Sequence, residues 1–163
     1  MPDDIINKME ETIHDLINDT HQMARLRQSL TLPNNIEAIP QLNEFIDIIC
    51  EEQGIDFDAA MSLNLALEEA VVNVMDYAYP EGTEGYVDID ADADDESLTF
   101  VISDSGIPFD PTQKEEVDTT LPAEERQVGG LGIHLVRRIM DSIEYEYTNN
   151  KNILTLRKKL NKQ

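Results

Sequence analysis

One stretch of the sequence decides the fold: residues 67–73 read Leu67-Glu68-Glu69-Ala70-Val71-Val72-Asn73. Two carboxylates lie here inside an apolar segment, and the spacing predicts a helix over about residues 58–78, with a buried face formed by Leu63, Leu67, Ala70, Val71 and Val74. Residues four apart lie about 40° apart around a helix, so Glu69 and Asn73 share one face. Glu68 points roughly 140° away from Asn73.

The pair of Glu69 and Asn73 fits two kinds of chemistry. A carboxylate beside an amide oxygen can hold a hydrated Mg²⁺, because this ion prefers oxygen ligands and keeps several waters. The carboxylate could instead orient or deprotonate a hydroxyl nucleophile or a water. Taken alone, the pair is also typical of an ordinary solvated helix edge, so it needs support from elsewhere in the chain.

A second segment, Asp104-Ser105-Gly106, follows a strand expected over residues 97–103. A carboxylate at a strand end can accept a hydrogen bond from an exocyclic amine, and Gly106 has no side chain to obstruct a flat ring such as adenine. A tight turn of this composition is also ordinary connection chemistry.

A third segment, Gly129-Gly130-Leu131-Gly132, leads into a helix expected through Asp141. Backbone N–H groups and the positive end of the helix dipole can hold an anion such as a triphosphate there, although glycines before a helix can also simply permit a turn. The run lacks the lysine of a Walker motif. Residues 108–128 show little periodicity and are expected to form a lid.

The order of these three segments resembles the N, G1 and G2 boxes of the GHKL ATPase superfamily. Two further runs, Pro108-Phe109-Asp110-Pro111 and Met140-Asp141, make the chain similar to the anti-sigma factor serine/threonine kinases of that superfamily. The resemblance covers about residues 26–160. Together with the order of the expected elements, it implies an α+β fold: a two-layer α/β sandwich whose mostly antiparallel mixed sheet is covered on one face by helices, the histidine-kinase-like ATPase fold.

The resemblance also implies roles for individual residues, with ATP and Mg²⁺ as cofactors. Glu69 would be the general base for the attacking serine or threonine hydroxyl, and Asn73 would bind Mg²⁺. The nucleotide would be held by four residues: Asp104 at the adenine, Gly106 lining the base pocket, and Gly130 and Gly132 accommodating the phosphates. Members of this family phosphorylate a small antagonist protein and separately sequester a sigma factor.

The sequence departs from the family pattern in three places. Tyr77 stands where many relatives have histidine, and Lys151-Asn152-Ile153 replaces small and hydroxyl residues before the last strand. The expected lid offers few cations, chiefly Lys114 and Arg126, which leaves less help for a transferring phosphate. The alternative to a kinase is therefore an ATP-binding interaction switch without kinase activity.

The N-terminal residues 1–25 are expected to form a helical extension of an ATP-binding domain over residues 26–163. Residues 2–24 carry an apolar seam with spacings of three and four: Ile6, Met9, Ile13, Leu16, Thr20 and Met23. The seam could pair two chains in a short coiled coil, giving a homodimer, or dock on the chain's own domain. His14 on this helix raises a histidine-kinase-like module as a third hypothesis, which a single helix in place of a dimerising hairpin disfavours.

Composition excludes several classes of function. The chain has 34 acidic and 12 basic residues, and a net charge of −22 would repel a nucleic-acid backbone while favouring a basic protein partner. The single cysteine, Cys50, excludes an intrachain disulfide and is expected to be a buried thiol. A chain with this single thiol fits a reducing cytoplasm, and because no run of 18 apolar residues occurs, we expect no membrane-spanning segment.

Overall fold

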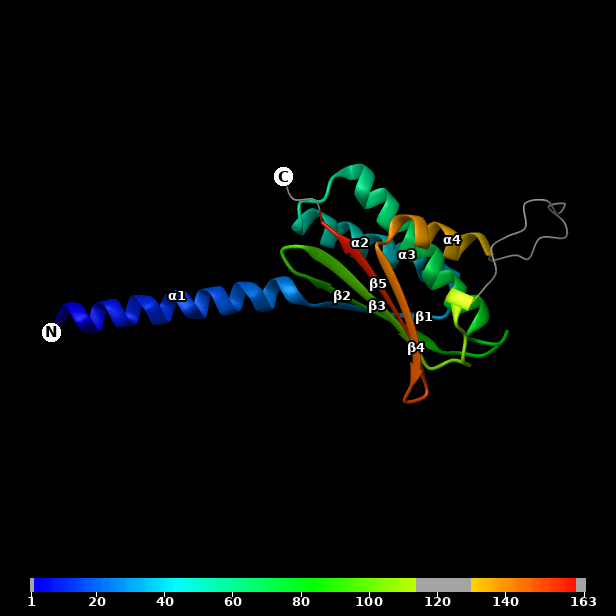
Figure 1. The fold of residues 1–163 in the computed structure, drawn as a ribbon. Helices are drawn as coiled ribbons and strands as arrows, with labels where there is room; N and C mark the ends of the chain where they lie inside the picture. The colour runs from blue at the N-terminus through cyan, green and yellow to red at the C-terminus, as the bar shows by residue number, and fades with distance from the viewer. Residues whose placement is uncertain (1, 114–129, 161–163) are drawn as a thin grey trace.

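The computed structural model describes residues 2–113 and 130–160 and has two layers (Figure 1). One layer is a five-stranded sheet in the order β1 (Gln28–Pro33), β2 (Tyr86–Ala93), β3 (Ser97–Asp104), β5 (Lys151–Lys159) and β4 (Ser142–Thr148). The other layer is formed by α2 (Ile39–Glu52), α3 (Phe57–Tyr77) and α4 (Gly130–Ile139). The two-layer α+β sandwich is thus confirmed. All four pairings between the described strands are antiparallel, so among these strands the sheet is not mixed, in contrast to the expectation.

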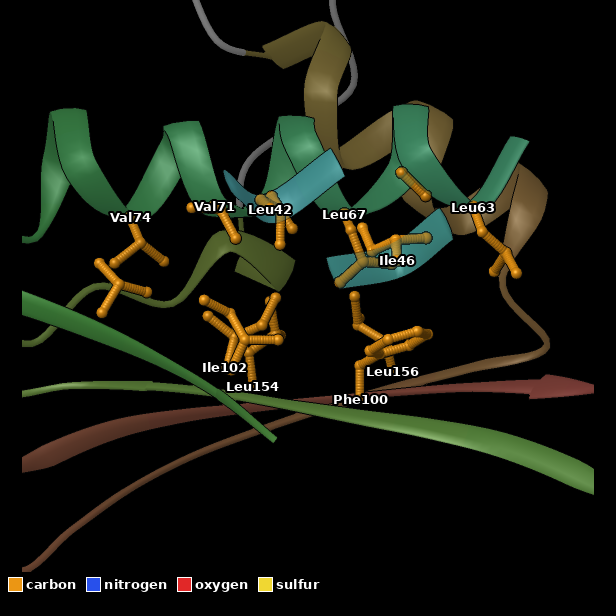
Figure 2. Packing of buried hydrophobic residues seen from close by; sticks show 14 of the residues in the cluster. Leu42, Ile46, Leu63, Leu67, Val71, Val74, Phe100, Ile102, Leu154 and Leu156 are labelled. Carbon is orange, nitrogen blue, oxygen red and sulfur yellow. The ribbon is translucent and has the colours of Figure 1, made fainter. Parts of the chain in front are cut away.

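The core lies between the helices and one face of the sheet. Every second residue of β2 and β3 is buried, as expected when one face of a strand packs against helices. Figure 2 shows Phe100, Ile102, Leu154 and Leu156 of the sheet meeting Leu67 and its neighbours on the helices. All five residues expected on the inner face of α3 are buried, because their helical spacing directs them toward the sheet.

Local sequence signals explain where several elements begin and end. Asp56 caps α3 by accepting a hydrogen bond from the backbone N–H of Ala59 at 2.8 Å. Asn149 and Asn150 both have positive φ angles, 53° and 61°, and form the two-residue turn between β4 and β5, a position for which asparagine is well suited. Gly54, with φ of 67°, follows the end of α2, where a left-handed conformation favours glycine.

Some bounds differ from the expected ones. The N-terminal helix α1 runs from Pro2 to Leu26, one residue past the expected extension over residues 1–25, and the first strand begins at Gln28. Gly130 and Gly132 lie inside the first turn of α4, where the sequence suggested glycines ahead of a helix. β5 begins at Lys151, so Asn152 lies within the sheet.

Outside the two layers, α1 extends from the edge of the sheet at β1 and projects away from the rest of the chain (Figure 1). None of the helices in the described ranges is both long and apolar enough to span a membrane.

Candidate functional site

The site is built around Asp104, the last residue of β3. Its side chain is 2 % exposed. One carboxylate oxygen, Oδ1, accepts from the backbone N–H of Gly106 and from the side-chain amide of Asn152, both at 2.9 Å. The other oxygen, Oδ2, is buried and has no hydrogen-bond partner among the described residues. Burial raises the pKa of this carboxyl, while its two hydrogen bonds act in the opposite direction. Such an orphaned acceptor is expected where a ligand supplies the missing donor.

Asn152 on β5 holds Asp104 and the loop that follows it. Besides its bond to Asp104, the side-chain amide donates to the carbonyl of Ile107 at 2.8 Å. Its oxygen accepts from the backbone N–H of Phe109 at 2.9 Å and from the hydroxyl of Tyr145 at 2.5 Å. Burial raises the pKa of the Tyr145 phenol, which therefore remains a donor at neutral pH. The buried amide of Asn152 thus fixes the start of the loop that leads toward the expected lid.

The same loop is attached to the C-terminal end of α3. The backbone N–H of Ile107 donates to the carbonyl of Ala78 at 2.8 Å. A Cβ atom at Gly106 would lie only 2.3 Å from that carbonyl oxygen, so only glycine permits the approach. Gly106 is therefore required by packing, in addition to its expected role of leaving room for a base.

An aromatic pair adds a second contact between α3 and the loop. The rings of Tyr77 and Phe109 stack with their centroids 5.3 Å apart and an interplanar angle of 22°. Phe109 belongs to the Pro-Phe-Asp-Pro run, and Tyr77 lies four residues after Asn73 on the same helix. The two segments that carried the sequence argument are therefore packed against each other.

Glu69 and Asn73 lie on α3, as the sequence predicts, and one helical turn separates them. Asn73 is buried, although its side-chain amide makes no hydrogen bond within the described residues, and Glu69 is half-buried. Glu69 precedes Ala78 by nine residues, or about 14 Å along the helix axis. Its carboxylate is thus distant from the Asp104 end, as suits a group that acts on the far end of an elongated ligand.

The phosphate end of the expected site is only partly described. Gly130 and Gly132 lie in the first turn of α4, which packs beside α3. Lys114, Arg126 and most of the expected lid lie outside the described residues. Arg137 of α4 donates to the carbonyl of Thr112 at 2.6 Å and so connects α4 to the described N-terminal part of the expected lid.

Of two cavities in the described part of the chain, one is lined by predicted site residues and the other is not. A cavity of about 730 Å³ is lined by Asp104 and Gly106, together with the segment that joins α3 to β2. Glu69 and Asn73 do not line it. A second cavity, of about 900 Å³, is lined by three cations, Arg138, Lys158 and Lys159, and by none of the predicted site residues.

Comparison with protein families matches residues 32–158 to the histidine kinase-like ATPase domain. The chain belongs to this ATPase family. The match spans α3, the Asp104 loop and α4, which carry all six predicted site residues, and it confirms the fold expected from the sequence. The N-terminal helix α1 lies before the matched range.

Three of the curated proteins that resemble this ATPase domain are serine-protein kinases called RsbW. The protein of Listeria monocytogenes serovar 1/2a is 25% identical over 143 residues, covering 81% of this chain and 88% of that protein. The protein of Halalkalibacterium halodurans is 28% identical over 124 residues, covering 69% and 75%. The protein of Bacillus subtilis is 26% identical over 119 residues, covering 66% and 74%.

Comparison with solved structures finds a match to the histidine kinase domain of the blue-light activated histidine kinase from Erythrobacter litoralis EL346. The TM-score is 0.45 and the sequence identity is 16%, and the similarity covers 77% of this chain and 60% of that one.

Sequence reasoning noted Asn152 as a departure from the family pattern but did not recognise it as part of the site. A signal was present in the alternation of β5, because Asn152, Leu154 and Leu156 occupy every second position and all three are buried. A polar residue in such a row requires buried partners. Tyr79 was also missed: its hydroxyl donates to the carbonyl of Tyr86 at 2.7 Å and accepts from Ser105 at 3.1 Å.

Proposed function

We propose that the chain is an ATP-dependent protein serine/threonine kinase that phosphorylates an antagonist protein and also sequesters a sigma factor. The observation that carries the proposal is the buried, unpartnered Oδ2 of Asp104 in a member of the histidine kinase-like ATPase family. The similarity to the RsbW serine-protein kinases supports the kinase activity. The cytoplasm is the compartment in which such a protein would act.

The described residues fit a purine nucleotide. Oδ2 of Asp104 would accept a hydrogen bond from the exocyclic amine of adenine, which a guanine does not offer at that position. Asn73, buried with an amide that has no partner in the described part of the chain, would supply an oxygen ligand for Mg²⁺. A Mg²⁺ at this position would be held mainly by the amide of Asn73, phosphates and waters.

ATP would supply the transferred phosphoryl group, and Mg²⁺ would offset the charge on its phosphates. Glu69 would accept the proton of the attacking serine or threonine hydroxyl, which makes that oxygen a better nucleophile. The first turn of α4, with Gly130 and Gly132, would present backbone N–H groups to the phosphates. Neither glycine carries a side chain that would hold the phosphates away from the backbone.

The experiment that tests this proposal measures ATP binding by calorimetry, with and without Mg²⁺, and then phosphate transfer to the antagonist protein. Glu69→Gln should lower transfer by about 10²–10⁴-fold, the range that a general base contributes, while ATP still binds. Glu68→Gln is the matched control, because Glu68 is the adjacent carboxylate on α3 and is also half-buried. The kinase proposal is wrong if the parent forms no phosphoprotein and partner release by ATP survives Glu69→Gln unchanged; an interaction switch would then remain.

A further inference from the structure

The N-terminal half of α1 presents an apolar face to solvent. More than half of each of four large side chains is exposed: Ile5 at 64%, Ile6 at 53%, Met9 at 58% and Ile13 at 52%. Three of them, Ile5, Met9 and Ile13, also line a groove of about 330 Å³ on the helix, together with Lys8 and Thr12. Figure 1 shows that α1 points away from both layers of the domain, so these four side chains do not dock on the domain in this structure.

Such a helix needs a partner for its apolar face. An isolated helix is marginally stable in water, and most helical stability in proteins comes from packing an amphipathic face. The face of α1 is a continuous stripe with one exposed apolar residue per turn from Ile6 to Ile13, so one long apolar surface should cover it.

The seam has the chemistry of a two-stranded coiled coil. If Ile6 is an a position, the a positions of the sequence are Ile6, Ile13 and Thr20, all β-branched, and the d positions are Met9, Leu16 and Met23, all unbranched at Cβ. Among parallel coiled coils, β-branched residues at a with leucine at d favour two strands over three or four. The occupant that fits this face is therefore another helix of the same register.

We propose that α1 pairs with α1 of a second copy of this chain in a parallel, in-register coiled coil. The charges of the helix permit this arrangement. In a parallel pair the g position of one helix lies near the following e position of its partner, and these positions combine Ile5 with Glu10, Thr12 with Ile17, and Asp19 with Ala24. None of these pairs opposes two like charges. The inference is independent of the nucleotide chemistry.

Light scattering of the full-length protein over a concentration series tests the pairing. The parent should reach twice the 18.5 kDa of one chain. Ile13→Asp places a charge in the seam and should hold the mass at that of one chain, while the thermal transition of the domain is retained. His14→Asp is the matched control, because it adds the same charge at the next, outward-facing position, and it should dimerise like the parent. A monomeric parent at every concentration, or a dimer that survives Ile13→Asp, would overturn the proposal.

Disulfide trapping tests the orientation. Ile6→Cys should form a dimer disulfide rapidly on mild oxidation, because in a parallel pair the two side chains at this a position meet within the reach of a disulfide. The native Cys50 will not compete, since it is buried and burial raises the pKa of its thiol to about 11. Glu11→Cys, at an outer f position of the same helix, is the control. Equal trapping at both positions, or none at Ile6→Cys in a dimeric sample, would show that the helices are not parallel and in register.

Discussion

The side-chain amide of Asn152 donates to Oδ1 of Asp104 at 2.9 Å and leaves Oδ2 of the same carboxylate without a partner. One residue of β5 thereby fixes the orientation of an acceptor on β3, across the middle of the sheet. A preoriented acceptor can bind a donor group without first being ordered, which lowers the free energy cost of binding.

Asn152→Ala should therefore weaken ATP binding and destabilise the fold. Each buried partner left without its hydrogen bond costs about 1–3 kcal/mol, and the amide serves several. Calorimetry with ATP and urea unfolding measure the two effects. Asn64→Ala is the control, because Asn64 on α3 donates to Asp47 at 2.9 Å and lies 14 residues before Ala78, where the Asp104 loop contacts the end of the helix. This variant should lower stability without changing ATP affinity. Unchanged ATP affinity in Asn152→Ala would show that Asn152 does not orient Asp104 for the nucleotide.

The buried face of α3 and the contact of Asp104 with Asn152 differ in how far the sequence alone could predict them. The buried face of α3 could be read from spacing, because all its residues lie on one element with one period. The contact of Asp104 with Asn152 joins residues 48 positions apart, and its geometry depends on strand order and register, which local patterns do not specify. Local sequence patterns therefore could not predict the hydrogen bonds that join the two strands at this site.

Gly106 illustrates a second limit. Its missing side chain could be interpreted from sequence as space for a base, but the contact with Ala78 depends on how the Asp104 loop packs against the end of α3. The seam on α1 shows the same limit in another form. Its period was readable, whereas the choice between docking on the domain and pairing with another chain required the direction in which α1 leaves the sheet.

Gly106→Ala should destabilise the protein and lower ATP affinity together. The added Cβ would lie 2.3 Å from the carbonyl oxygen of Ala78, so the loop must shift, at a cost of about 1–3 kcal/mol for overpacking. Gly82→Ala is the control, because Gly82 has φ of 83° and no atom within 4 Å of its Cβ, so it tests backbone strain alone. Thermal unfolding and ATP calorimetry measure both variants. Equal losses of ATP affinity in the two would rule out a specific role for the contact at Ala78.

The stacked rings of Tyr77 and Phe109 should be energetically coupled. Aromatic pairs contribute about 0.5–1.5 kcal/mol beyond the area that they bury, so the combined substitution Tyr77→Leu and Phe109→Leu should cost less than the sum of the single ones. Urea unfolding of the four proteins in the cycle gives the coupling free energy. A coupling near zero would mean that the rings are held independently, and that α3 and the loop are joined mainly by the bond from Ile107 to Ala78.

ATP binding should strengthen as the pH rises through the titration of Asp104. The ionised carboxylate offers Oδ2 as an acceptor to an amine, and protonation places a hydrogen on the carboxyl group that competes for this position. Because burial raises the pKa of Asp104 above its ordinary 3.8, the loss of affinity on acidification should begin at a higher pH than for an exposed aspartate. Calorimetry over a pH series measures it. Asp104→Asn should bind ATP weakly throughout, with no such step.

The carboxyl of Asp104 should also make the free energy of unfolding depend on pH in the absence of nucleotide. The folded state, with its raised pKa for Asp104, holds a proton at pH values where the unfolded chain has already lost it, so the free energy of unfolding falls as the pH rises through the window just above 3.8. Asp104→Asn removes this titration and should make stability less dependent on pH there.

Asp94 has the opposite effect on stability, because backbone N–H groups of Glu96 and Ser97 lower the pKa of its carboxyl. The stability that Asp94 contributes is lost as the pH falls below 3.8. Urea unfolding at a series of pH values separates the two windows. If Asp104→Asn alters only the lower one, then the carboxyl of Asp104 does not titrate at a raised pKa in the folded protein.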